Sequence, residues 1–184
     1  MATSLNRNDW LEAGLRLISD GGPKRLSIDA LCTAVGVTKG SFYHHFVHHA
    51  DFVSAMLAHW QITHTQRLID TVEGIKDPKQ RGERLSQLVY AKNMKPEVAL
   101  RAWGNSHPEV ASAVAAVDAQ RLAYLEELAQ HMGADPQRAL LMARIGYAHL
   151  IGIQHLPMLL TPDDALEMDQ LLNTLLFADV ERKT

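Results

Sequence analysis

The fold of this chain is decided by residues 26–46, which read LSIDALCTAVGVTKGSFYHHF. Ser27 can cap a helix over residues 28–35, where apolar residues recur every three or four positions. Gly36 favours the left-handed backbone that ends a helix, and Thr38 can then cap a second helix. The stretch therefore predicts a helix-turn-helix.

The second helix of this pair carries groups that can contact DNA. Phe42 and Phe46 are four residues apart and are expected to face inward, so the polar residues around them face outward. Lys39 can donate to a guanine edge or a phosphate, and Gly40 lets the backbone come close to a ligand. An ordinary helical hairpin has similar serine and glycine residues at its helix ends, but the full run of residues 38–46 favours DNA recognition.

Residues 5–60 resemble the N-terminal domain of the TetR family of transcriptional regulators. The most specific part of the resemblance is residues 37–46, and a helix predicted over residues 8–20 supplies an apolar face that packs under the hairpin. The residues of that face are Trp10, Ala13, Leu17 and Ile18. The resemblance implies an all-helical C-terminal domain that dimerises and binds a small effector.

The hairpin geometry and the resemblance together predict the DNA-binding residues. In the resemblance, His45 stands at a phosphate-side position, and His49 stands where the family often has a lysine at the start of the fourth helix. The predicted set is Ser27, Thr38, Lys39, Gly40, Ser41, Tyr43, His44, His45 and His49. The predicted partner is a near-palindromic double-stranded DNA operator.

Four histidines lie within six residues, at positions 44, 45, 48 and 49. Histidines four residues apart on a helix can chelate a transition metal. The chain is expected to turn after Phe46, however, so the four rings should not share one face. No metal site, no cofactor and no enzymatic activity are predicted, and a histidine-cluster metal-binding helical protein or metalloenzyme is the alternative.

The charge of the chain fits DNA binding less well than its motifs do. The formal net charge is −3, and residues 1–60 hold five basic and five acidic side chains. DNA-binding domains generally gather positive charge on one face. The attraction to phosphate is therefore expected to be modest and to depend on salt.

The composition is typical of a cytoplasmic protein. The single cysteine, Cys32, is expected to pack between the two short helices. The N-terminus has no apolar run typical of a signal peptide, and the most apolar stretch, residues 139–160, contains charged and polar side chains. A cytoplasmic protein with no membrane partner is predicted.

From Asp51 onward the apolar spacing predicts only helices. One apolar stripe ends near Gly74, and prolines or polar breaks start further helices. The predicted fold is all-α with about nine helices. An N-terminal three-helix helix-turn-helix DNA-binding domain is expected over residues 1–50, and a helical-bundle effector-binding and dimerisation domain over residues 51–184.

The last two predicted helices, residues 137–155 and 163–178, are apolar on more than one face. One face can pack on the chain's own domain and another on a second copy, about a two-fold axis. A thick monomeric core would give the same pattern. DNA recognition favours the homodimer, because one short helix contacts only a few base pairs.

The resemblance also implies an unidentified small-molecule effector, bound in the C-terminal body. Its site is expected to combine apolar walls with a few polar groups, although each candidate could instead be a core residue. The candidates are His64, Met94, Trp103, Tyr124, Tyr147 and Ile151. The predicted function is a sequence-specific homodimeric repressor that the effector releases from its operator, with a TetR-like activator as a further alternative.

Overall fold

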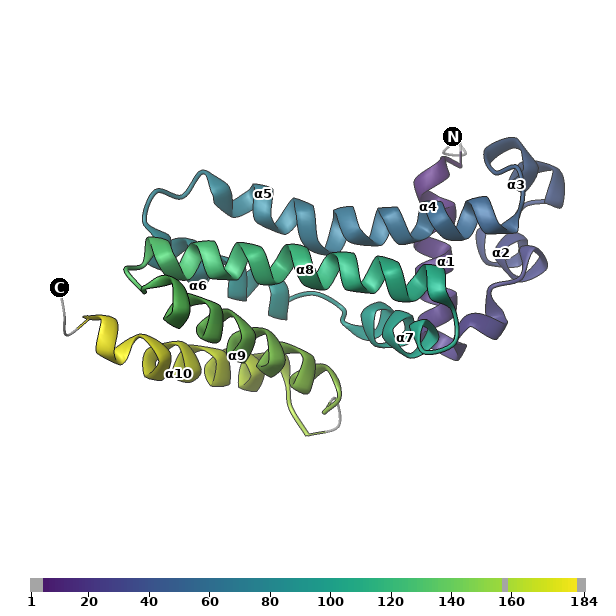
Figure 1. Ribbon diagram of the computed structural model, residues 1–184. Helices are drawn as coiled ribbons and strands as arrows, with labels where there is room; N and C mark the ends of the chain where they lie inside the picture. Colours follow the sequence, from purple (N-terminus) through teal and green to yellow (C-terminus); the bar gives the residue numbers. More distant parts are fainter. Residues whose placement is uncertain (1–4, 157–158, 182–184) are drawn as a thin grey trace. The chain divides into compact units, whose positions relative to one another are not determined.

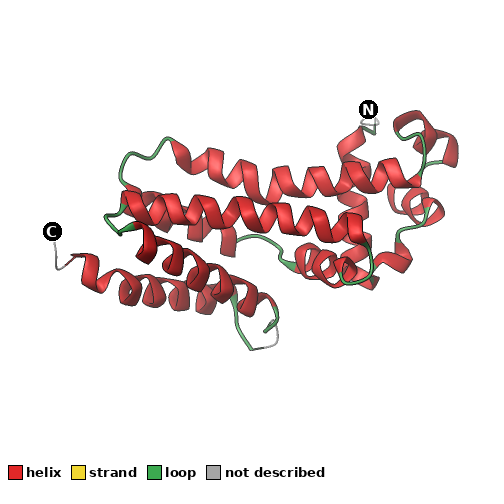
Figure 2. Cartoon of the chain, viewed as in Figure 1, coloured by secondary structure: helices red, strands yellow, loops and turns green. Residues whose placement is uncertain are grey.

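Helices form every regular element of the structure, a computed structural model that describes residues 5–156 and 159–181 (Figures 1 and 2). No strand occurs within these two ranges, so the predicted all-α class is confirmed. In chain order the elements are α1 (Arg7–Gly21), the 3-10 turn η1 (Pro23–Arg25), α2 (Ile28–Val35), α3 (Lys39–His45), α4 (His49–Gln61), the π-helical segment η2 (Ile62–Gln66), α5 (Arg67–Glu73), α6 (Pro78–Tyr90), α7 (Lys95–Gly104), α8 (Pro108–His131), α9 (Pro136–Gln154) and α10 (Pro162–Glu181). Within the described ranges these make nine helices when α4, η2 and α5, which follow without a break, count as one and η1 is left out. None of the helices described there combines the length and apolarity that crossing a bilayer requires.

Contacts along the chain divide it into two compact units. Unit 1 comprises Met1–His64 with Lys95–Ala115, and unit 2 comprises Thr65–Met94 with Ala116–Thr184. The helix-turn-helix therefore belongs to unit 1, and α9 and α10 belong to unit 2. The functional boundary predicted after residue 50 stays a prediction, because compactness alone does not locate a function.

The helix-turn-helix forms where the sequence predicts it. The Ala30 N–H donates a 3.2 Å hydrogen bond to Ser27 Oγ, which caps α2. Gly36 ends α2 in the left-handed region, with φ 76° and ψ 32°. Thr38 occupies the N-cap of α3, but its side chain makes no capping hydrogen bond. The start of α3 therefore depends on the glycine turn more than on a threonine cap.

An aromatic cluster in unit 1 holds α3 against α1 and α4. Trp10, Phe42, Phe46 and Phe52 are each at most 1% exposed. The Trp10 and Phe42 rings meet edge-on with centroids 5.5 Å apart, and Phe46 and Phe52 meet edge-on at 5.1 Å. Such pairs stabilise by about 0.5–1.5 kcal/mol beyond the burial of their area. The cluster fixes a helix of seven residues that would not persist alone.

Unit 2 contains a buried carboxylate between α6 and α10. Asp169 is 8% exposed and accepts hydrogen bonds from Ser86 Oγ at 2.7 Å and from Tyr90 Oη at 3.2 Å. Asn173 Nδ2 donates a third, at 3.0 Å. Burial and the adjacent Asp169 charge raise the pKa of the Tyr90 hydroxyl, so it remains a donor. The bonds from Ser86 and Tyr90 join α6 to α10, and the bond from Asn173 lies within α10.

Large apolar side chains remain on the surface of α9 and α10. Leu141 and Ile145 on α9 are 54% and 45% exposed, and Leu171 and Leu175 on α10 are 62% and 64% exposed. The members of each pair are four residues apart, so each pair forms a stripe along one face of its helix. Both stripes fall within the helices predicted to form a homodimer.

Gly14→Ala tests the close packing of α1 on α4. A Cβ atom at Gly14 would lie 2.7 Å from Met56 Sδ and 2.7 Å from Phe52 Cζ. Both of these side chains are 0% exposed, so the surrounding core would have to move with them. We expect the free energy of unfolding to fall by about 1–3 kcal/mol, because overpacking outweighs the better helix propensity of alanine. Urea unfolding followed by circular dichroism measures the change.

Gly40→Ala is the matched control, since a Cβ atom there meets only Thr38 Oγ1, at 3.7 Å. We expect this variant to keep the wild-type stability or to gain up to about 1 kcal/mol. Equal stabilities for the two variants would contradict the close approach at Gly14.

Candidate nucleic-acid interface

Most of the predicted DNA-binding residues lie on the surface of unit 1. Among the nine, Ser41, His45 and His49 are partly buried. The six exposed members are Ser27, Thr38, Lys39, Gly40, Tyr43 and His44. Tyr43 is 56% exposed, and its ring meets the buried Phe42 ring edge-on with centroids 5.5 Å apart. A tyrosine held in this way offers its hydroxyl at a defined place on α3.

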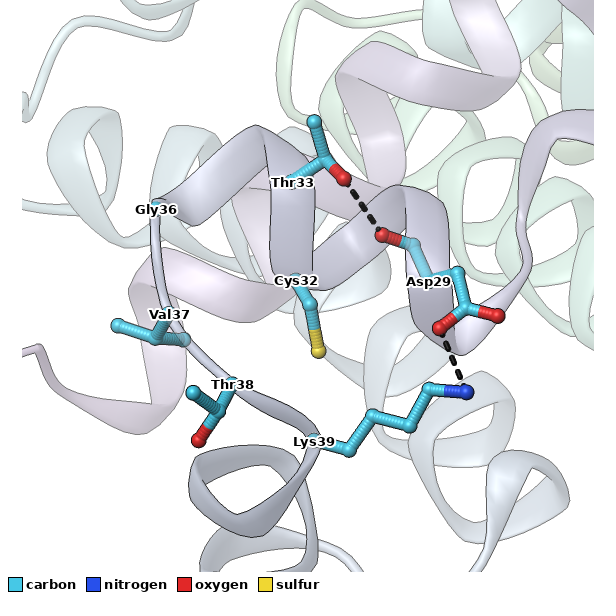
Figure 3. Close-up of a pocket in the computed structure, with 7 residues that line it drawn as sticks. All are labelled: Asp29, Cys32, Thr33, Gly36, Val37, Thr38 and Lys39. Atoms are coloured by element: carbon cyan, nitrogen blue, oxygen red, sulfur yellow. Dashed lines mark hydrogen bonds and ion pairs between the residues drawn. The ribbon is translucent and has the colours of Figure 1, made fainter.

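Lys39, the first residue of α3, is paired with Asp29 of α2 (Figure 3). Its Nζ lies 2.7 Å from Asp29 Oδ1, and the two side chains are 59% and 73% exposed. The hydrogen bond to Asp29, together with the Asp29 charge, raises the pKa of the Lys39 ammonium. Exposed pairs of this kind add little to stability. An anion that binds Lys39 therefore replaces a weakly held carboxylate.

The pair borders a shallow depression between α2 and α3 (Figure 3). Its lining residues are Asp29, Cys32, Thr33, Gly36, Val37, Thr38 and Lys39. Cys32 is 7% exposed, and burial, followed by the Asp29 charge, raises the pKa of its thiol. A neutral, buried thiol is unreactive. Cys32 is therefore a packing residue between the two helices, as predicted.

Asp29 is absent from the predicted set although it contacts the most basic group of the hairpin. A carboxylate in the first turn of a helix is expected simply because it complements the helix dipole. Asp29 and Lys39 are ten residues apart and separated by a turn, so helical periodicity does not predict that they meet. Their contact depends on how α2 and α3 cross at Gly36, which the sequence pattern does not specify.

His45 lies at the edge of the aromatic cluster. Its ring centroid is 6.3 Å from that of Trp10 and 6.2 Å from that of Phe46. The neighbouring His44 ring, 5.1 Å away, is exposed. His44 is therefore the more accessible of the two. Within the described ranges, no three histidine, cysteine or carboxylate side chains come together as a metal site would require.

His48 and His49 are engaged by backbone groups at the start of α4. The Asp51 N–H donates a 3.0 Å hydrogen bond to His48 Nδ1, so His48 caps the helix. His49 Nε2 donates to the carbonyl oxygen of Leu26, just before α2. The phosphate contact expected at His49 stays a prediction, and the ring that would make it already holds a structural bond through one nitrogen.

The six residues predicted for an effector site divide between the units. Unit 1 contains His64 and Trp103, and unit 2 contains Met94, Tyr124, Tyr147 and Ile151. Trp103 is 7% exposed, with its ring centroid 5.1 Å from that of His107. His64 Nδ1 lies 3.0 Å from Thr63 Oγ1. Burial, with the Glu73 charge next in size, raises the pKa of the Tyr124 hydroxyl.

Tyr147 belongs to a polar cluster within unit 2. Its hydroxyl donates to Asp118 Oδ1 at 2.6 Å and accepts from Arg121 Nη1 at 3.4 Å. Arg121 Nε donates to Thr65 Oγ1 at 2.9 Å. Tyr147 and Thr65 are 7% and 2% exposed, whereas Asp118 and Arg121 are partly exposed. Partly buried polar networks occur both in ligand sites and in structural contacts between helices.

Comparison with protein families and curated proteins finds similarity that is confined to part of the chain. The family model described as "Bacterial regulatory proteins, tetR family" matches residues 11–56, within α1 to α4. The transcriptional regulator AcuR of Cereibacter sphaeroides is 36% identical over 67 residues. These residues span 36% of this chain and 30% of AcuR, so the chain matches less than a third of that relative.

Solved structures extend the likeness to the whole fold. A transcriptional regulator from Pseudomonas aeruginosa PAO1 has a TM-score of 0.75 at 16% identity, covering 98% of this chain and 96% of its own. E. coli NemR in its reduced form has a TM-score of 0.74 at 21% identity, covering 92% and 95%. A transcriptional regulator from Saccharomonospora viridis in complex with choline has a TM-score of 0.74 at 18% identity, covering 94% and 95%. At these identities the likeness concerns the fold alone.

His48→Ala tests the histidine cap of α4. Loss of the acceptor for the Asp51 N–H should lower the free energy of unfolding by about 0.5–2 kcal/mol, the usual cost of removing an N-cap. His48→Asn should restore most of this stability, because an asparagine oxygen is a good capping acceptor. Chemical unfolding of the three proteins gives the comparison.

His44→Ala serves as the control, since His44 is an exposed ring on α3 that caps no helix. Its effect should stay within about 0.5 kcal/mol, as for most surface substitutions. A loss at His48 no larger than the loss at His44 would show that the cap contributes nothing.

Proposed function

We propose that this chain is a regulator of the TetR family that binds DNA in a sequence-specific manner, because residues 11–56 match the model of that family of bacterial regulatory proteins. In finer detail, we propose a homodimeric repressor that a small-molecule effector releases from its operator. The observation that carries the proposal is the α2–α3 pair joined by the left-handed Gly36, with Lys39 and Tyr43 exposed on the second helix.

In this proposal α3 enters the major groove and α2 crosses the DNA backbone. Lys39, at the N-terminal end of α3, exchanges Asp29 for a guanine edge or a phosphate. Gly40 lets the backbone approach the bases, and the Tyr43 hydroxyl donates to a phosphate. The free energy gained at Lys39 is the difference between its interaction with DNA and its interaction with Asp29. One subunit is therefore expected to bind DNA with modest affinity.

A second copy of the chain compensates for the modest DNA affinity of one subunit. The exposed stripes at Leu141 and Ile145 and at Leu171 and Leu175 support pairing through α9 and α10. Two such helices from each copy make a four-helix interface about a two-fold axis. The paired α3 helices then bind a near-palindromic operator whose half-sites are about one helical turn or more apart.

The effector is proposed to bind the C-terminal body. The Saccharomonospora viridis regulator of the same fold was solved with choline. The polar cluster of Tyr147, Asp118 and Arg121 supports a site with charged or hydrogen-bonding ligands on unit 2. The effector would favour a conformation in which the paired α3 helices are wrongly spaced, and so shift the population off the operator.

Selection of bound fragments from a genomic DNA pool tests the proposal and supplies the operator for the variants below. The bound fragments should share a near-palindromic sequence, and its position relative to a promoter distinguishes repression from activation. Failure to enrich any sequence, with no retention of DNA at low salt, would contradict DNA recognition by this fold.

Lys39→Ala should weaken binding to the selected operator by about threefold to tenfold, because a cation that reaches bases or phosphate is lost. The slope of log affinity against log salt concentration should fall by about one for each subunit. Titration of labelled operator at several salt concentrations measures both quantities.

Lys76→Ala is the control for this measurement. Lys76 lies in the loop between α5 and α6, and its substitution by alanine removes the same charge as Lys39→Ala. It should leave both the affinity and the slope close to wild type. A Lys39→Ala variant that behaves like Lys76→Ala would mean that α3 does not read the DNA.

Leu171→Glu should convert the homodimer into a monomer, because it buries a charge in the proposed apolar interface. Operator affinity should fall by about a hundredfold or more as the second α3 is lost. Sedimentation velocity gives the mass, and operator titration gives the affinity. Ile62→Glu, at an exposed apolar residue outside α9 and α10, should remain dimeric; a dimeric Leu171→Glu variant would exclude this interface.

A further inference from the structure

Arg7, the first residue of α1, contacts Phe46 at the end of α3. Its guanidinium carbon is 5.0 Å from the centroid of the Phe46 ring. Its Nη2 lies 4.0 Å from Asp51 Oδ1, in the first turn of α4. The Arg7 side chain is 53% exposed. Three elements of unit 1 therefore meet at a guanidinium that solvent still reaches.

The surroundings of Arg7 belong to the proposed DNA-facing surface. Phe46 is the residue that ends α3, and the turn that follows exposes Val47 to 79%. His48 then caps α4 and is exposed. A DNA duplex that receives α3 in its major groove brings its phosphates to the ends of that helix. Arg7 stands at one of these ends.

The two neighbours of Arg7 orient its guanidinium without occupying its donors. The Phe46 ring contacts the guanidinium through a cation–π interaction, which uses none of its N–H groups in a hydrogen bond. The 4.0 Å separation from Asp51 Oδ1 is longer than a hydrogen bond. The other oxygen, Asp51 Oδ2, accepts from the Val47 N–H at 3.0 Å, so this carboxylate also holds the turn.

We infer that Arg7 is a further DNA-binding residue, which binds a backbone phosphate beside α3; the inference rests on the proposed function. A guanidinium binds phosphate through two parallel N–H bonds, and its planar fork loses little freedom when it does so. The Phe46 ring reduces that loss further, because the guanidinium is already oriented. Asp51, held by the Val47 N–H, stays with the protein when the phosphate arrives.

The test compares substitutions at two arginines of α1. Arg7→Gln removes the charge and the fork, and Arg7→Lys keeps the charge without the fork. Arg16→Gln is the matched control, because Arg16 is exposed on the same helix, nine residues further along. Operator affinity is measured across a range of salt concentrations, and chemical unfolding of each variant reports its stability.

Arg7→Gln should bind the selected operator about tenfold more weakly at low salt, and its salt slope should fall by about one for each subunit. Arg7→Lys should lose less affinity and keep the wild-type slope, since the charge remains near the phosphate. Arg16→Gln should stay within about twofold of wild type in affinity.

Two results would overturn the inference while leaving the proposed function intact. In the first, wild type binds and Lys39→Ala weakens binding, but Arg7→Gln matches Arg16→Gln. In the second, Arg7→Gln loses affinity with an unchanged salt slope and a lowered unfolding free energy, which assigns Arg7 to the support of Phe46 alone. A wild-type protein that shows no salt-dependent DNA binding would overturn the proposed function and this inference together.

Discussion

The packing of Trp10 against Phe42 is the constraint on which the rest of unit 1 depends. A seven-residue helix such as α3 is unstable by itself, and only tertiary contacts keep it folded. Trp10 comes from α1 and Phe52 from α4, and both are 0% exposed. Every polar group offered by the outer face of α3 is therefore positioned by rings on its inner face. The position of α3 is as rigid as this aromatic cluster.

Residues 1–60, which include the proposed DNA-facing surface, carry no formal net charge. Residues 1–60 hold equal numbers of basic and acidic side chains, and two of the cations lie beside carboxylates. Lys39 is bonded to Asp29, and Arg7 lies near Asp51. Net charge alone would argue against DNA binding, whereas in the proposed complex a phosphate takes the place of Asp29 at Lys39 or lies next to Asp51 at Arg7. In that proposal the affinity for DNA depends on exchange between anions more than on total charge.

The helices of this chain could be predicted from local signals, and the contacts of the candidate interface could not. Pro78, Pro136 and Pro162 each open a helix, because proline fixes the backbone without needing its own N–H. Gly36 ends α2 for a reason that is equally local.

The missed contacts join elements whose crossing is decided by packing. Asp29 with Lys39, Arg7 with Phe46, and the His49 ring with the Leu26 carbonyl oxygen all bring together residues from separate helices or loops. Hydrophobic periodicity shows which face of a helix is buried, but it does not show which charged residue of another element contacts the edge of that face. The division at His64 and Thr65, inside an unbroken helical run, is likewise invisible to composition or turn signals.

The single cysteine gives the helix-turn-helix an internal reporter of its own opening. Cys32 is buried under the meeting of α2 and α3, with a thiol whose pKa is raised by burial. Because Cys32 also lines the depression between α2 and α3, the rate at which a thiol reagent labels Sγ changes when the contact between these two helices changes. Because the chain contains one cysteine, the signal comes from this hairpin alone. The motion that loosens α3 can thus be followed in the unmodified protein, without introducing a probe.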